Sequence, residues 1–340
     1  MKNPKPSSGA GRFRAAARQA AAPAVPDSGE DRARGALLGT FVGDALGMPF
    51  EGAESRFIPA LLEMEEARLG RGTYTDDTQM MIALAESLLR CDVVDPEDLA
   101  RSFRAHFDPR RGYGAGTTRV IELWERGQPV ETASRLLFGG TGSLGNGAAM
   151  RVAPVAVRFC EDEVLLAPEA RRSARLTHSH PLGMDGAVVQ AAAVAAALEG
   201  RDALQAAIAA AGTAEVRERL FTLRQATEAG LSPDRLAGPA GRVGASAPES
   251  VPPAIVAGAR AATFEEAVTV AIRCGGDTDT VGAMAGAIAG ARFGAAAIPA
   301  RWLEALEDGP YGRRHVEELA VGLAARARGA ASTALHGRRR

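Results

Sequence analysis

The stretch "RCGGDTDTVGAMAGAIAGARFG", from Arg273 to Gly294, joins a glycine pair, two aspartates and a long run of small residues. The run after Thr280 predicts a buried helix, and its glycines and alanines allow close approach of a neighbouring backbone. One aspartate at such a helix start is an ordinary N-cap, because its side chain accepts a hydrogen bond from an unpaired amide. Asp279 is a second carboxylate, which one helix start does not need. The stretch therefore predicts a site as well as a helix.

A second apolar helix begins with the same kind of oxygen-bearing side chains. "YTDDTQMMIALAESLLR" places Thr75, Asp76 and Asp77 before apolar residues at helical spacing. If the two helix starts meet in one cleft, four carboxylates converge. Like charges about 4 Å apart repel by roughly 4 kcal/mol even at an effective dielectric of about 20, and each helix dipole offsets only about 0.3 to 1 kcal/mol. A cation is therefore needed to offset the repulsion. Carboxylate and hydroxyl oxygens are hard ligands that suit Mg²⁺ or Mn²⁺, and a two-metal site would use this many oxygens.

Helical spacing of apolar residues recurs along most of the chain. "GALLGTFVGDALGMPFEGAE" has a glycine at every fourth position from Gly35 to Gly47, which predicts a helix with one bare face ahead of Glu51. "MDGAVVQAAAVAAALEG" predicts an alanine-rich helix that stops at Gly200. Alternating strand-type patterns are nearly absent, and aromatic residues make up only 5% of the chain. The sequence predicts an all-α fold.

Composition indicates one soluble domain between two tails. Residues 1–30 and 327–340 are rich in small and basic residues and poor in large apolar ones, so we expect disordered tails around a domain over 31–326. The Gly/Pro/Ser-rich stretch 228–254 is expected to be a surface loop. A net charge of -1 does not favour binding to nucleic acids or anionic membranes, and no uninterrupted apolar stretch approaches the roughly 18 to 20 residues of a membrane helix. The three cysteines lie far apart and do not indicate a disulfide framework, which agrees with the reducing cytoplasm.

A glycine-rich segment suggests an anion site. "FGGTGSLGNGAAMRVAPVA" carries Gly140, Gly142 and Gly145 at the spacing of a dinucleotide fingerprint. That fingerprint must follow a strand, whereas the preceding "ETASRLLF" has a helical pattern, so a Rossmann fold is excluded. Small residues ahead of a helix still predict a nest of amides for a phosphate or diphosphate. A loop without a ligand stays the alternative.

Four motifs in this order resemble the ADP-ribosylglycohydrolase family: "GDALGMPFEG", "GTYTDDTQM", "GTGSLGNGAAMR" and "GGDTDTVGAMAGAIAGARFG". The match extends from about Gly35 to Gly294, with "RGYGAGTTRV" and "LTHSHPLGMDGAVVQA" between. The resemblance implies a compact, orthogonal all-α bundle with two Mg²⁺ or Mn²⁺ ions, which hydrolyses the bond at the anomeric carbon of the distal ribose. "RGYGAG" and "GSLGNGAAMR" resemble the branch acting on serine-linked ADP-ribose more than the arginine-directed branch.

The resemblance also implies roles for individual residues. The implied metal ligands are Thr75, Asp76, Asp77, Asp277, Asp279 and Thr280. The implied substrate contacts are Tyr113, Gly114 and His178 at the distal ribose, Phe138 at adenine, and Gly142, Ser143, Leu144, Gly145 and Asn146 along the diphosphate. Some relatives have an aromatic residue at the position of Leu144. The leucine in this chain implies that adenine is held more loosely. Glu51, on a movable flap, Asp76 and Asp77 are the candidates for the catalytic base.

The implied partner is the ADP-ribose moiety of modified proteins or of small derivatives, with nucleic acid bound only if it is ADP-ribosylated. We expect a monomer. Two other functions stay open, namely an ADP-ribose-binding protein without activity and a Mg²⁺-dependent phosphohydrolase that uses the same acids. All six implied metal-site residues and Glu51 are present, which favours the hydrolase.

Overall fold

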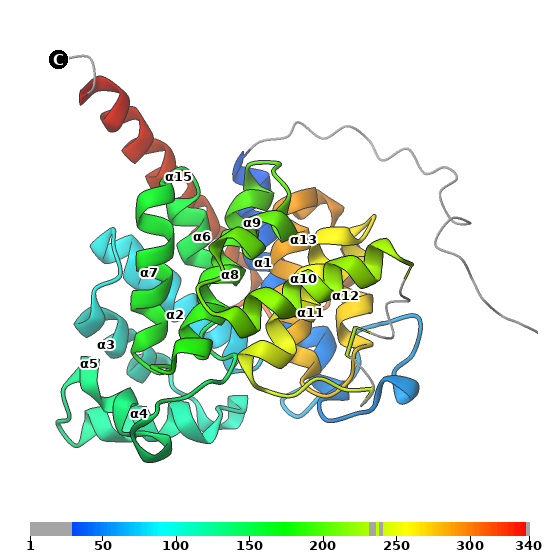
Figure 1. Ribbon diagram of the computed structural model, residues 1–340, viewed down its shortest axis with the longest axis horizontal. Coiled ribbons are helices and arrows are strands. Elements are labelled where there is room, and N and C mark those ends of the chain that lie inside the picture. Colours follow the sequence, from blue (N-terminus) through cyan, green and yellow to red (C-terminus); the bar gives the residue numbers. More distant parts are fainter. Residues whose placement is uncertain (1–28, 231–235, 238–240, 338–340) are drawn as a thin grey trace, which may run out of the picture.

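A computed structural model describes residues 29–230, 236–237 and 241–337, without the side chains of 330–337. In these ranges the chain forms α-helices, short 3-10 turns and two isolated bridges, and no strand (Figure 1). The all-α prediction is confirmed. Of the predicted N-terminal tail, residues 1–28 lie outside the described residues, and the first helix begins at Gly29.

The helices follow one another through mostly short connections. Figure 1 shows α3, α4 and α5 gathered on one side of the molecule and α10, α11 and α12 on the other. The bounds are α1 Gly29–Gly47, α2 Asp76–Cys91, α3 Pro96–His106, α4 Ala115–Glu125, α5 Val130–Ala133, α6 Ala153–Phe159, α7 Glu163–Arg175, α8 Pro181–Leu198, α9 Ala203–Ala210, α10 Ala214–Glu228, α11 Ala247–Arg260, α12 Phe264–Ile272, α13 Thr278–Phe293, α14 Ala300–Leu303 and α15 Arg313–Gly337.

Helices α1 and α13 pack together along matching rows of glycines. A Cβ atom at Gly39 would lie 2.1 Å from the carbonyl oxygen of Gly286, and one at Gly43 would lie 2.0 Å from that of Gly282. No side chain fits at such a distance, so the two backbones touch directly. The close approach expected of the "VGAMAGAIAGA" helix is therefore made with α1. The reason is that α1 carries the complementary glycines at the same four-residue spacing.

Helix α8 runs through the core. It is the one described helix that is long and apolar enough, by length and composition, to cross a membrane, with a mean hydropathy of 1.4 over 18 residues. Of that window 72% is buried inside the protein, as expected of a core helix. The sequence expectation concerned uninterrupted apolar stretches, and it agrees with α8, because the buried polar residues Asp185 and Gln190 interrupt this helix.

Two other segments differ from expectation. Helix α11 begins inside the predicted surface loop 228–254 and contains Pro248, Pro252 and Pro253. Pro248 lies in the first turn, where an amide has no helical acceptor. Pro252 and Pro253 lie inside the helix and are buried, and each lacks the amide that would donate to the preceding turn. The predicted domain end at Arg326 falls inside α15, which continues to Gly337.

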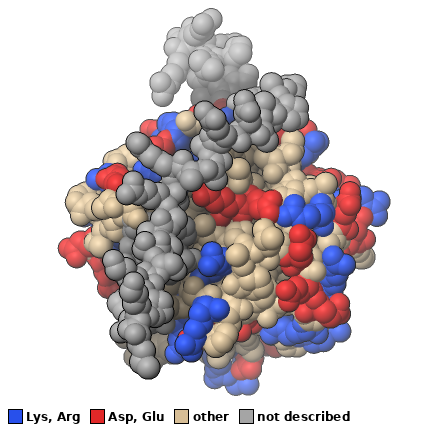
Figure 2. Space-filling model, turned by 90° about the vertical axis from the view of Figure 1, so that its right-hand side faces the viewer, with Lys and Arg blue, Asp and Glu red and all other residues tan. Residues whose placement is uncertain are grey.

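Surface charge is mixed in sign. On the face drawn in Figure 2, acidic and basic side chains are interspersed, and the described part of that face carries no broad basic patch. This distribution agrees with the net charge of -1. A protein that binds nucleic-acid phosphates usually gathers its basic residues on one face.

Candidate active site

The first turns of α2 and α13 open into one pocket of about 220 Å³. Its wall includes the carboxyl groups of Glu51, Asp76, Asp77, Asp277 and Asp279, together with Thr280. The structure thus brings together acids from three segments, the outermost of which lie more than 200 residues apart in the sequence. The two acidic helix starts meet, as the sequence predicted.

Helix α1 holds both helix starts in place. Its buried Asp44 accepts hydrogen bonds from the Thr75 amide (3.0 Å to Oδ1), the Thr78 amide (3.1 Å to Oδ2) and the Thr78 hydroxyl (2.6 Å). At the end of α1, the carbonyl oxygen of Gly47 accepts from Thr278 Oγ1 of α13 at 2.8 Å. Burial raises the pKa of Asp44 to about 6, although the bonds from Thr78 and Thr75 oppose that shift. Asp44 is therefore a structural acid behind the pocket.

Thr75 and Asp277 differ in how they begin their helices. Thr75 caps α2, since its Oγ1 accepts from the Asp77 amide at 3.3 Å. Asp277 occupies the N-cap position of α13, but its side chain makes no capping hydrogen bond. Its Oδ2 instead accepts from Asn146 Nδ2 at 2.6 Å. Capping therefore does not account for the carboxylate of Asp277.

The acids face one another without a cation in the pocket wall. Among the described residues its lining contains neither Lys nor Arg, and Arg68 Nη2 lies 3.4 Å from Glu51 Oε2 at the mouth. Burial and the repulsion of Asp44 and other acids raise the pKa of Asp76 to about 7. The pKa values of Asp77 and Asp279 are raised well above the usual range, first by burial and then by neighbouring carboxylates.

This donor set fits a divalent cation. Asp77 Oδ2 is buried and has no hydrogen-bond partner among the described residues, and Thr280 Oγ1 lies 3.4 Å from the other oxygen, Oδ1. A cation would neutralise the repulsion and satisfy the unpaired oxygen. As they stand, however, no three His, Cys, Asp or Glu side chains in the described ranges form a set that could hold an ion. The metal-ligand roles stay predictions.

Six of the nine substrate-binding residues implied by the resemblance line the same pocket: Gly114, Phe138, Ser143, Gly145, Asn146 and His178. Tyr113, Gly142 and Leu144 lie outside this lining, as does the predicted ligand Thr75. The hydroxyl of Tyr113 donates to Gln79 Oε1 at 2.8 Å, behind the pocket wall. Leu144 is partly exposed, and its carbonyl oxygen accepts from the Ala247 amide. The individual substrate roles stay predictions.

Sequence reasoning missed part of the wall. The additional lining residues are Gly112, Gly116, Thr117, Gly147, Met150 and Ala245. All but Ala245 fall inside "RGYGAGTTRV" or "GSLGNGAAMR", so the motifs could have revealed them. Ala245 lies in the Gly/Pro/Ser-rich stretch and had no such signal, because its place depends on backbone pairing with Asn146, whose amide donates to its carbonyl oxygen at 3.0 Å.

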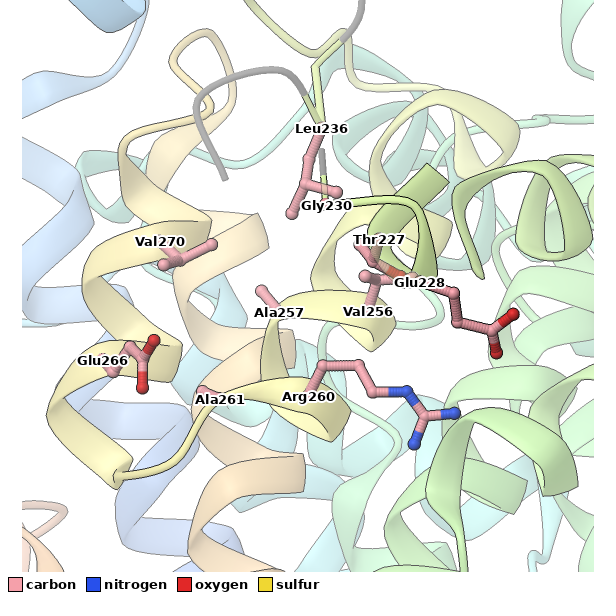
Figure 3. Close-up of a pocket in the computed structure, with 10 residues that line it drawn as sticks. All are labelled: Thr227, Glu228, Gly230, Leu236, Val256, Ala257, Arg260, Ala261, Glu266 and Val270. Atoms are coloured by element: carbon pink, nitrogen blue, oxygen red, sulfur yellow. The ribbon is translucent and has the colours of Figure 1, made fainter. Parts of the chain in front are cut away.

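A larger pocket of about 370 Å³ lies away from the acids, between α10, α11 and α12 (Figure 3). Its apolar wall includes Leu236, Val256, Ala257, Ala261 and Val270. Two of its charged side chains already have partners: Arg260 Nη1 donates to Asp202 Oδ2 at 3.1 Å, and Glu266 Oε2 accepts from the Ala262 amide at 2.7 Å. The described lining of this pocket contains no cluster of reactive groups, so the acid-lined pocket is the candidate site.

Known proteins are similar to this chain over most of its length. The model of the ADP-ribosylglycohydrolase family matches residues 26–333. ADP-ribosylhydrolase ARH3 from Danio rerio is 33% identical over 320 residues, which cover 80% of this chain and 85% of that protein. The ADP-ribosyl-[dinitrogen reductase] glycohydrolase of Rhodospirillum rubrum is 30% identical over 299 residues, covering 82% and 90%.

A solved structure is also similar. The structure described as an ADP-ribosylglycohydrolase-related protein complex superposes with a TM-score of 0.72 at 33% identity, covering 88% of this chain and 99% of the other. Both acidic helix starts and the glycine-rich loop lie within the residues matched by the family model. Because that match also spans nearly all of the described helices, this chain belongs to the ADP-ribosylglycohydrolase family.

Proposed function

We propose that the protein is a hydrolase that cleaves the glycosidic bond at the anomeric carbon of the distal ribose in ADP-ribosylated proteins or small ADP-ribose derivatives. The observation that carries the proposal is the convergence of five carboxyl groups on one pocket, which a glycine-rich loop also lines. Membership in the family supports a hydrolase. The names of the relatives support ADP-ribose as the substrate.

The acids of α2 and α13 would hold two Mg²⁺ or Mn²⁺ ions. The proposed ligands are Thr75, Asp76, Asp77, Asp277, Asp279 and Thr280. When bound, the ions would supply positive charge that binds the vicinal hydroxyls of the ribose and positions a water molecule. The unpaired Oδ2 of Asp77 and the raised pKa values of the cluster both favour this assignment.

The loop around Ser143 is suited to the diphosphate. The amides of Gly142, Gly145 and Asn146 donate within the protein. Among the described residues, no protein acceptor lies within hydrogen-bond range of the amides of Ser143 and Leu144. Ser143 lines the pocket, so its amide and its hydroxyl are the proposed diphosphate donors, followed by the Leu144 amide just outside that lining.

Phe138 is suited to stack on the adenine. Its side chain is 63% exposed although it is a large aromatic, and its backbone φ is 49°. Gly116 lies beside the ring, since a Cβ atom there would be 3.5 Å from it, at ordinary van der Waals contact. Exposed aromatic faces bind nucleobases by stacking.

Glu51 is the proposed general base. It lies in the turn after α1 at the pocket mouth and is exposed, whereas Asp76 and Asp77 are buried and belong to the proposed ligand set. A carboxylate that binds a metal ion is a poor base. Departure of the acceptor develops positive charge at the anomeric carbon, which the surrounding carboxylates stabilise.

Product analysis tests the proposal. The protein is incubated with Mg²⁺ and with serine-, arginine- or nucleic-acid-linked ADP-ribose. We expect free ADP-ribose, released fastest from the serine linkage, because "RGYGAG" and "GSLGNGAAMR" resemble the branch acting on serine-linked ADP-ribose. AMP or inorganic phosphate would indicate a phosphohydrolase, and saturable binding without product would indicate a binding protein; either result overturns the proposal.

A further inference from the structure

Arg151 is a buried cation with no carboxylate partner among the described residues. Its guanidinium donates to the carbonyl oxygens of Gly147 (3.0 Å) and Ser173 (3.1 Å) and to Thr177 Oγ1 (2.8 Å). Burial lowers the pKa of Arg151 to about 9, so the side chain is still charged at neutral pH. Burying a charge without an opposite charge costs free energy. Thr177, which Arg151 contacts, is next to the pocket residue His178 in the chain.

Thr177 connects Arg151 to His178. Thr177 Oγ1 lies 2.7 Å from His178 Nδ1 and is fully buried. A guanidinium can only donate, so the hydroxyl oxygen is the acceptor in the bond with Arg151. No other acceptor for the hydroxyl hydrogen lies in range in the described part of the chain, apart from Nδ1 itself. If Nδ1 carried a hydrogen, the hydroxyl hydrogen would be buried without a partner.

The opposite edge of the imidazole faces the pocket. A Cβ atom at Gly147 would lie 3.0 Å from His178 Nε2, and one at Gly145 would lie 3.3 Å away. The two glycines therefore leave Nε2 open to the pocket that His178 lines. Within the described residues Nε2 has no protein partner. Burial, with the charge of Arg151, lowers the pKa of His178 to about 3, so the ring is neutral.

We propose that Arg151 and Thr177 are positioning residues that hold His178 as the neutral Nε2–H tautomer, with this N–H directed at an acceptor oxygen of the substrate. His178 then donates a hydrogen bond and does not act as an acid or a base in the reaction. The identity of the acceptor rests on the proposed function. The tautomer does not, because it follows from hydrogen bonds present without substrate.

The tautomer is measured by ¹⁵N NMR of the full chain labelled at histidine, with the His178 signals assigned by their loss in His178→Ala. We expect a protonated Nε2 and an unprotonated Nδ1 before any ligand is added. ADP-ribose should shift the Nε2 resonance. In Thr177→Val the hydroxyl is absent, so the Nδ1–H form should become populated and KM for the ADP-ribosylated substrate should rise about tenfold, with a smaller change in kcat.

Two controls separate positioning from packing. Thr177→Ser keeps the hydroxyl and should keep the Nε2–H form. Thr40→Val removes another buried hydroxyl, which donates to the Ala36 carbonyl oxygen at 3.1 Å, and should leave the His178 signals unchanged. An Nδ1–H form in the wild type, or an unchanged tautomer in a folded Thr177→Val protein, overturns the inference even if the enzyme is active. The expected tautomer in a protein that releases no ADP-ribose would instead contradict only the proposed function.

Discussion

Asp277 stands where a helix cap is expected, and its carboxylate bonds to Asn146 instead of the helix amides. Asp76, Asp77 and Asp279 are likewise buried against other acids. At the scale of single residues, repulsion between these carboxylates therefore destabilises the folded protein until a cation binds between them. Two substitutions separate the acids that would bind a cation from the acid that supports them.

Replacing Asp279 by alanine should abolish tight Mg²⁺ binding and reduce ADP-ribose release by roughly 10²-fold or more, because a charged ligand in a buried site is lost. Calorimetric titration with Mg²⁺ and a product assay measure the two effects. Asp202→Asn is the matched control, since Asp202 is an exposed helix cap paired with Arg260. Full activity of Asp279→Ala after removal of metal by a chelator would contradict the two-metal mechanism.

Replacing Asp44 by asparagine should destabilise the protein by about 2 kcal/mol or more, because the buried carboxylate accepts from the Thr75 and Thr78 amides and the Thr78 hydroxyl. An asparagine oxygen cannot accept all of these bonds, and its NH₂ group would face a donor. Urea unfolding measures the loss. A variant as stable as the wild type would show that Asp44 does not organise the start of α2.

At the scale of elements, α1 connects the halves of the site. Its glycine face packs on α13, its Asp44 anchors the start of α2, and its last carbonyl anchors the start of α13. The spacing of the glycines was visible in the sequence, and so was the helix that carries them. Which helix would meet the glycine row of α13 was not, because a bare face indicates close packing without identifying the partner.

The glycine contact predicts an asymmetry between two alanine substitutions. In Gly39→Ala the new methyl group would lie 2.1 Å from the Gly286 carbonyl oxygen, so the helices must separate and the free energy of unfolding should fall by about 3 kcal/mol. At Gly309 nothing lies within 4 Å of the position that a methyl group would take, and alanine should be tolerated there. Thermal unfolding of the two variants tests this, and equal stabilities would refute direct backbone contact.

At the scale of the whole molecule, the buried acids should make stability depend on pH and on divalent metal. Acids whose pKa is raised on folding bind more protons in the folded state, so the stability they contribute falls as pH rises from the unfolded value through the folded one. Asp76, at about 7, and the more strongly shifted Asp77 and Asp279 act in this sense. His178 acts in the opposite sense, but it contributes at most one proton and only below its unfolded value.

Without metal, Tm should therefore fall as the pH rises from about 5 to about 8. Mg²⁺ at about 100 times its Kd should add about 2.7 kcal/mol, and the gain should be larger at the higher pH, where protons compete less for the carboxylates. Calorimetric scans across this range, with and without Mg²⁺, give both curves. A metal-free protein whose Tm rises steadily over the range would contradict the raised pKa values.

The sequence alone determined the all-α character of the fold, the two acidic helix starts and the bare glycine faces, because these depend on residues close together in the chain. Helical periodicity and capping chemistry act over a few residues, so they can be recognised without a structure. Only the tertiary structure decided that α1 is the partner of α13, that Asp44 lies behind the acids and that Arg151 reaches His178 through Thr177. These contacts join segments distant in the chain, and their hydrogen bonds exist only after the helices have packed.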